Sequence, residues 1–193
     1  GLTNIKSIGE SQIKNLHGEL EKHPETWTAF LLHIELNKTI TNNIICVGIL
    51  DHFGIPRKQM LHELNCYNQL SDREKDAVRT RKFNSLVETL EWLIQQPRKT
   101  GCSNKNRIAL VQDLIISLKN PPYELVDRPS WIYHQEVALL GCPLTFSLLD
   151  LCHGYDVNST CKEFKDGKSG LISVAVELIS SREYIIKQGK NKG

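Results

Sequence analysis

The chain lacks a long uninterrupted run of apolar residues. No segment reaches the roughly 18–20 apolar residues that cross a bilayer, and residues 1–11 lack the basic start and apolar core of a signal peptide. A strong excess of one charge is also missing, because the net charge is +2. The whole molecule therefore has no field that would draw it to nucleic acid or to a membrane, and such binding would need a local patch. Because the first residue is Gly1 rather than Met, we expect a piece of a longer protein.

The sequence also lacks the motifs of common enzymes and nucleotide-binding proteins. It contains no GxSxG, no GxxxxGK(S/T) and no GxGxxG, which excludes the usual nucleophile elbow, P-loop and dinucleotide fingerprint. Cys152 and His153 are adjacent, but neighbours on a helix point about 100° apart and do not form a nucleophile–base pair. We therefore predict a protein that is not an enzyme and that needs no cofactor.

The six cysteines include no CxxC pair. A chain of 193 residues can bury a stable core without disulfide bonds, which favours reduced thiols and a cytoplasmic location. Structural zinc sites usually pair ligands about two to four residues apart, and no such pair occurs among the soft ligands near the C-terminus. We predict no metal, and we keep as the alternative a zinc site made by Cys142, Cys152, His153 and Cys161.

Start and stop signals for short helices follow one another between residues 49 and 127. Apolar residues recur at helical spacing over 57–67, 83–94 and 108–118, and the charged segment 71–80 forms another short helix. Residues 98–105 are polar and basic and predict a loop. The signals that separate these helices are Pro56, the capping-box pair Ser71 and Glu74, Pro97, the N-cap candidates Ser103 and Asn104, and Pro121–Pro122.

The rest of the chain also favours helices. The apolar spacing predicts one helix that ends before Pro24 and a second that begins near Trp27. The run 40–53 is compatible with a strand, but its helical neighbours favour a buried helix. Further along the chain, we expect a helix over 144–151, a long loop over 153–170 and, although 171–179 also alternates like a strand, a helix there.

These patterns predict an all-α protein, a bundle of short amphipathic helices with a C-terminal helical extension. We expect three segments. Residues 1–37 form an N-terminal helical pair, 38–127 the central bundle, and 128–193 the extension.

Basic residues gather in the central segment. Lys75, Arg79 and Lys82 recur at i, i+4 and i+7, so we expect them to line one helical face. Arg98 and Lys99 lie in the loop that follows, together with Lys105 and Arg107. If the two regions fold together they form a positive patch, which is either a solvated face or a contact surface for an acidic protein or for phosphates. We predict that the partner-binding residues are Lys75, Arg79, Lys82, Arg98 and Lys99.

Five short stretches of the central segment occur in an order that is known from one family. They are Ile49-Leu50-Asp51-His52-Phe53, Asn68-Gln69-Leu70-Ser71-Asp72-Arg73-Glu74, Phe83-Asn84-Ser85-Leu86-Val87-Glu88-Thr89-Leu90, Ala109-Leu110-Val111-Gln112-Asp113-Leu114-Ile115 and Pro121-Pro122-Tyr123-Glu124-Leu125. In this order, residues 38–127 resemble a caspase-recruitment (CARD-type) death-fold domain. The resemblance implies assembly through complementary charged faces, with Lys75, Arg79 and Lys82 on one face and Asp72, Glu74 and Asp76 on part of the other.

A second, fainter resemblance rests on Leu70-Ser71-Asp72 and on the helix over 86–94. These residues are similar to a turn and the following helix in the C-terminal autoinhibitory domain of gasdermins. That resemblance implies a clamp that covers an effector domain.

The function that we expect is therefore a non-enzymatic protein–protein interaction domain, an adaptor or assembly module in intracellular signalling. Its partner has an acidic surface, and homotypic self-association is one form of this. An autoinhibitory helical domain that masks an effector domain is the first alternative, and a helical domain that binds nucleic acid through a basic face is the second.

Overall fold

The computed structural model describes residues 5–6, 8–33, 35–152, 157–174 and 176. These residues form helices, turns and irregular segments without a β-strand, which confirms the predicted all-α class. The chain divides into two compact units, residues 1–144 and residues 145–193. Both boundaries of the three segments expected from the sequence, after residue 37 and after residue 127, fall inside the first unit.

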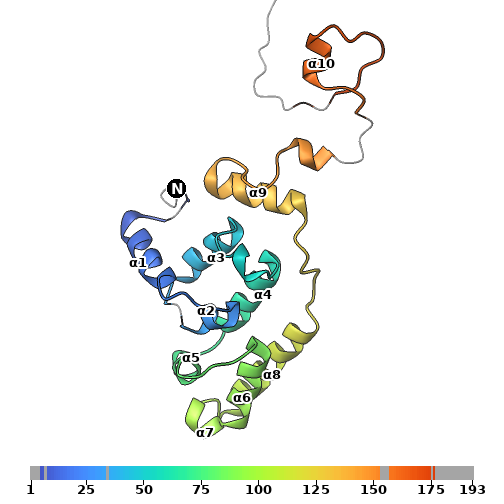
Figure 1. Cartoon of the computed structure of the whole chain (residues 1–193). Helices are drawn as coiled ribbons and strands as arrows, with labels where there is room; N and C mark the ends of the chain where they lie inside the picture. Colours follow the sequence, from blue (N-terminus) through green and yellow to red (C-terminus); the bar gives the residue numbers. More distant parts are fainter. Residues whose placement is uncertain (1–4, 7, 34, 153–156, 175, 177–193) are drawn as a thin grey trace, which may run out of the picture. The chain divides into compact units, whose positions relative to one another are not determined.

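The described residues of the first unit form a bundle of short α-helices together with the 3-10 helix η2 (Figure 1). In chain order these are α1 (Glu10–Leu20), α2 (Trp27–His33), α3 (Lys38–Cys46), η2 (Asp51–Phe53), α4 (Arg57–Tyr67), α5 (Asp72–Arg79), α6 (Leu86–Gln95), α7 (Pro97–Thr100), α8 (Lys105–Lys119) and α9 (Pro129–Leu140). In the second unit the described elements are the 3-10 helix η3 (Leu149–Cys152) and α10 (Cys161–Lys165).

Polar side chains start these helices where the sequence predicts. Ser71 and Glu74 form the expected capping box at α5, because the Ser71 hydroxyl accepts the Glu74 amide at 3.4 Å and the Glu74 carboxylate accepts the Ser71 amide at 2.8 Å. Asn104 caps α8 by accepting the amide of Asn106 at 2.9 Å. Ser85, which was not predicted as an N-cap, caps α6 in the same way. These bonds satisfy amides that a helix start leaves without a partner.

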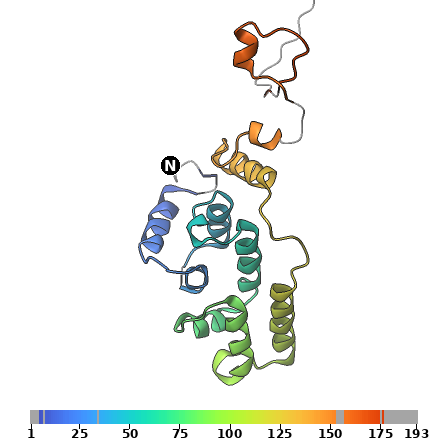
Figure 2. The same cartoon turned by 45° about the vertical axis from the view of Figure 1, so that its right-hand side comes forward.

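One hydrophobic core joins the helices of the first unit. The Trp27 and Phe30 rings of α2 stack with their centroids 5.6 Å apart and contact Phe53 of η2. α8 packs along α6, as Figure 2 shows. The largest fully buried side chains of the core include Trp27, Phe30, Leu16, Leu32, Ile44, Ile45, Leu50, Met60, Leu86, Leu90 and Leu93.

The sequence overestimates one helix and misses two others. The predicted helix over 40–53 ends at Cys46, because Gly48 takes the left-handed conformation (φ +81°) and turns the chain before η2. The predicted loop 98–105 begins with α7, since Pro97 occupies a first helical position, where its missing amide costs nothing. α9, which also begins at a proline, was not predicted as a separate helix.

Three predictions near the C-terminus are also corrected. Of the predicted helix 144–151, only the residues that belong to η3 are helical. Residues 144–148 form bends, a turn and irregular backbone. The described part of the predicted loop 153–170 contains α10, which Thr160 caps. Residues 171–174 and 176 are not helical, and residues 175 and 177–179 lie outside the described part of the chain.

A buried guanidinium connects α4 to the C-terminal end of α3, to η2 and to α9. Arg57 is only 3% exposed, and its Nη1 donates to the Cys46 carbonyl at 2.9 Å and to the Glu136 carboxylate at 3.0 Å. Its Nη2 donates to the Asp51 carboxylate at 2.7 Å. Burial alone would lower the pKa of Arg57, but the two carboxylates outweigh burial and raise it, so the guanidinium remains charged. Gly48 lies against this group, and a Cβ at that position would be 2.1 Å from Nη2.

The same cluster fixes the segment before α9. The Asp127 carboxylate accepts the backbone amides of Arg57 at 2.6 Å and Lys58 at 3.0 Å, at the start of α4. Glu136, fully buried, also accepts the amide of Leu144 at 2.6 Å. α9 and the segment 120–128 are therefore attached to the bundle through charge-assisted hydrogen bonds as well as through apolar contacts.

The charge cluster leads to a prediction about stability. Replacing Glu136 by Ala leaves a buried guanidinium with one carboxylate fewer, and we expect the free energy of unfolding to fall by about 3–5 kcal/mol. Urea unfolding followed by circular dichroism measures this change. Asp51→Ala is the matched control, because it removes a carboxylate that is 49% exposed from the same guanidinium and should cost less. Equal losses in the two variants would contradict the importance of burial at Glu136.

Candidate functional site

The predicted basic residues lie at the end of the first unit formed by α5, the turn 80–84 and α7 (Figure 1). Nine of the 24 lysines and arginines fall between residues 72 and 107, against five of the 22 carboxylates, so this part of a nearly neutral chain is basic. α5 and α7 pack together, and the side chain of Arg73 lies over Gly101, where a Cβ would be 2.7 Å from Cδ of Arg73. We call this region the basic end.

The predicted partner-binding residues differ in whether they already contact other side chains of the bundle. Arg79 is ion-paired with Glu35 at 2.8 Å and with Asp76 at 3.4 Å. The Lys75 ammonium lies 5.4 Å from the centre of the Tyr67 ring, at cation–π distance. Both side chains therefore already have partners within the bundle.

Lys82 and Lys99 differ from these two residues. Both are exposed, and neither forms an ion pair with a carboxylate in the described part of the chain. The prediction that Lys82 shares a helical face with Lys75 and Arg79 is wrong, because α5 ends at Arg79 and Lys82 follows in the turn. Arg98 belongs to α7, but its side chain is not described.

An ion pair between Glu74 and Arg107 joins α5 of the basic end to α8. The Glu74 carboxylate is 1% exposed and accepts from the Arg107 guanidinium, which also donates to the Gln69 carbonyl at 3.2 Å. Burial raises the pKa of Glu74, but the hydrogen bonds from Arg107 and Ser71 outweigh burial and hold the pKa below its ordinary value. The expectation that Glu74 contributes to an acidic contact surface is therefore wrong, because this carboxylate is enclosed.

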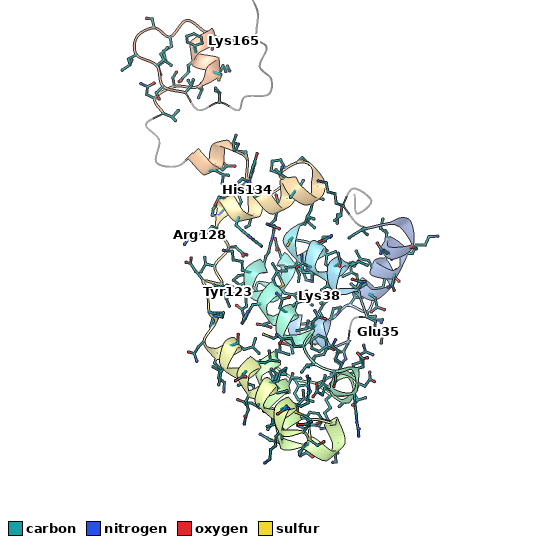
Figure 3. The ribbon with its side chains drawn as sticks, turned by 180° about the vertical axis from the view of Figure 1, so that it is seen from behind. Glu35, Lys38, Tyr123, Arg128, His134 and Lys165 are labelled. Atoms are coloured by element: carbon teal, nitrogen blue, oxygen red, sulfur yellow. The ribbon has the colours of Figure 1, made fainter. Side chains whose placement is uncertain are left out.

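A second surface feature was not predicted. It is a groove of about 460 Å³ between α4, the segment 120–128 and the start of α9. Figure 3 labels Tyr123 and Arg128, which lie along the segment that borders it. No single stretch of sequence signals this groove, because its lining residues come from four separate segments, among them Asn42, Lys58, Leu61, Asn65, Tyr123 and Trp131.

The cysteines divide into buried and exposed groups. Cys46, Cys66 and Cys102 are buried free thiols, and burial raises the pKa of Cys46 and of Cys66 to about 11. These two thiols are therefore protonated, and poor nucleophiles, at neutral pH.

The structure describes the side chains of only two residues of the alternative zinc site. Cys142 and Cys161 are exposed, the side chain of Cys152 is not described, and His153 lies outside the described residues. Among the residues that are described, no group of three or more His, Cys, Asp or Glu side chains is arranged to hold a metal ion.

Comparison with protein-family models, with curated proteins and with solved structures finds no match for this chain. The resemblances to a caspase-recruitment domain and to a gasdermin autoinhibitory domain therefore stay predictions. Within the described part of the chain, every helix is too short or too polar to cross a membrane.

The Glu74–Arg107 pair leads to a prediction about pH. The pKa of Glu74 is lower in the folded protein than in the unfolded chain, so the carboxylate stabilises the fold at pH values above its ordinary pKa. That contribution is lost as the pH falls through the folded-state pKa. We expect Glu74→Gln to lower the free energy of unfolding by about 1–3 kcal/mol near neutral pH, and by less as the pH approaches about 3.

Urea unfolding at a series of pH values measures this difference. Asp76→Asn is the matched control, because Asp76 is 68% exposed and pairs with Arg79 at the longer distance of 3.4 Å. A difference between wild type and Glu74→Gln that does not change with pH would contradict the role of the charged carboxylate.

Proposed function

We propose that the chain is a non-enzymatic protein-interaction module that acts as an adaptor in intracellular signalling. Its partner presents an acidic surface, which the basic end contacts. The observation that carries this proposal is the pair Lys82 and Lys99, two exposed cations that form no ion pair within the described residues. Lys82 lies in the turn after α5, and Lys99 lies on α7, which packs against α5. The resemblance to a death-fold domain supports the same conclusion from the sequence.

The surrounding contacts make the basic end a firm surface. Arg79 is fixed by Glu35, and the Arg81 guanidinium lies 4.4 Å from the centre of the Trp92 ring. The Glu74–Arg107 ion pair holds α5 against α8. Two exposed lysines beside side chains that are fixed by their own contacts favour fast and selective association with an acidic surface.

The acidic surface belongs to another protein or to a second copy of the chain. For self-association, Asp72 and Asp76 remain exposed on α5, whereas Glu74 is buried. A homotypic contact would therefore use these two carboxylates of one copy against Lys82 and Lys99 of the next. Because α5 also belongs to the basic end, such a contact would use the same end of both copies, and a two-fold symmetric dimer would satisfy it.

A double charge reversal tests this proposal. We expect Lys82→Glu with Lys99→Glu to weaken partner binding or self-association by at least about tenfold, since two exposed cations become anions that face an acidic surface. The free energy of unfolding should change by less than about 0.5 kcal/mol, because both side chains are exposed. Photo-crosslinking from positions 82 and 99 identifies the partner, and sedimentation velocity measures self-association.

The matched control is Lys14→Glu with Lys38→Glu, which changes the net charge equally at two exposed lysines outside the basic end. Binding that both double variants weaken alike would reflect net charge and not this site. Crosslinks from positions 82 and 99 to nucleic acid alone would replace the proposal by its nucleic-acid alternative. That alternative also requires an affinity that falls steeply with salt concentration.

The second unit supports a second candidate function, a regulatory domain that covers an effector domain. Asn158 closes a loop there, because its side chain accepts the Ser173 amide at 2.9 Å and donates to the Leu171 carbonyl at 3.1 Å. The loop exposes Phe164 to 63% and Leu171 to 96%. Apolar side chains that are this exposed favour contact with another surface.

A dye experiment separates this candidate from the first. If Phe164 and Leu171 belong to a surface that binds an effector domain, the isolated chain should bind the hydrophobic dye ANS, and Phe164→Ser with Leu171→Ser should reduce the bound fluorescence by about half or more. Lys162→Ser with Lys165→Ser, on the same short helix, is the control and should leave the fluorescence unchanged. Equal fluorescence in both double variants would contradict the candidate.

A further inference from the structure

The groove between α4, the segment 120–128 and α9 has a wall of aromatic and cationic groups. The Lys58 ammonium lies 5.5 Å from the centre of the Trp131 ring. No carboxylate of the described chain forms an ion pair with Lys58. An ammonium above an indole face keeps its outward hydrogens free to donate. The site therefore offers one oriented cation to a ligand, beside an apolar ring.

The second cation of the groove is already partly neutralised. Arg128 donates to the Glu124 carboxylate at 2.6 Å, and both side chains line the groove. The groove therefore carries a net charge close to that of Lys58 alone. This favours a ligand with a single acidic group over a polyanion, which Glu124 would repel.

Two amides face the same space. Asn42 of α3 and Asn65 of α4 line the groove. The side chain of Asn42 forms only a weak contact of 3.8 Å to the Cys46 sulfur, and the exposed side chain of Asn65 forms no hydrogen bond within the described residues. A carboxamide donates and accepts at one end, which matches the N–H and C=O groups of an extended peptide backbone. Leu61 and Trp131 between these polar groups offer apolar contact to a side chain.

The opposite border of the groove is held in place. The Tyr123 hydroxyl lies 3.0 Å from Nδ1 of His62, whose Nε2 lies 3.1 Å from the Ser117 carbonyl. Asp127 fixes the other end of the same segment on α4. A preformed groove lowers the entropy that a ligand loses on binding, because the protein side does not have to be ordered.

We propose that this groove binds an extended peptide segment of a partner protein that carries one acidic side chain flanked by apolar residues. The carboxylate pairs with Lys58, the amides of Asn42 and Asn65 contact the peptide backbone, and an apolar side chain packs on Leu61 and Trp131. A volume of about 460 Å³ lies within the usual range of ligand sites. A nucleobase fits less well, because Lys58 already covers a face of the Trp131 ring.

A random peptide library displayed on phage, selected on the full chain, tests the proposal. We expect enriched peptides to share an Asp or Glu beside apolar residues. Synthetic copies should then change the fluorescence of Trp131, and Lys58→Gln should weaken their binding by about tenfold, the loss of one charge-assisted hydrogen bond. Asn65→Ala is the second variant, because its side chain is exposed and forms no hydrogen bond to the described residues, so its removal should not unfold the chain.

The controls separate this site from the basic end. Lys14→Gln and the double variant Lys82→Glu with Lys99→Glu should both bind the peptides as wild type does, even if the proposed function of the basic end fails. Failure to enrich any sequence, or peptides that bind Lys58→Gln and Asn65→Ala as tightly as wild type, would overturn the proposal. A deoxythymidine oligonucleotide that competes with the peptides and loses affinity in Lys58→Gln would replace it with a nucleic-acid site.

Discussion

The buried guanidinium of Arg57 is the constraint on which the arrangement of the first unit depends. A charge that is 97% removed from solvent must be neutralised inside the protein. Its partners come from the C-terminal end of α3, from η2 and from α9, and Asp127 binds the amides that begin α4. Apolar contacts between these elements would survive small shifts of one helix against another. The hydrogen bonds of a buried ion pair would not, because they require defined distances between donor and acceptor atoms. The charge therefore selects one arrangement of α9 against the bundle.

This arrangement places the two candidate binding surfaces in different parts of the same compact unit. The groove exists because Asp127 and Glu136 hold the segment 120–128 and α9 against α4. The basic end depends on a different buried pair, Glu74 and Arg107, which joins α5 to α8. A variant that disturbs one surface should therefore leave the other folded. An adaptor needs this property if it is to connect two partners.

Local signals in the sequence predicted much of the fold and little of the groove. Caps, prolines and apolar spacing act within a few residues, so α4, the capping box at Ser71 and the cap at Asn104 were predictable. The end of α3 was not, because Gly48 turns the chain to make room for Arg57, a residue nine positions later. The basic end was predicted in outline, but the Arg79–Glu35 ion pair and the burial of Glu74 arise from tertiary contacts. The groove combines residues from α3, α4, α9 and the segment before α9, and no local sequence pattern predicts that these residues meet.

Hydrogen exchange on the Glu136→Gln variant tests the role of the Arg57 cluster most directly. This change keeps the size of the side chain and removes its charge. We expect amides of α9 and of the segment 120–128 to lose protection, while amides of α6 and α8, which lie outside the cluster, exchange at the wild-type rate. Unchanged protection in α9, or an equal loss of protection throughout the first unit, would contradict the claim that this buried charge positions α9 and the groove.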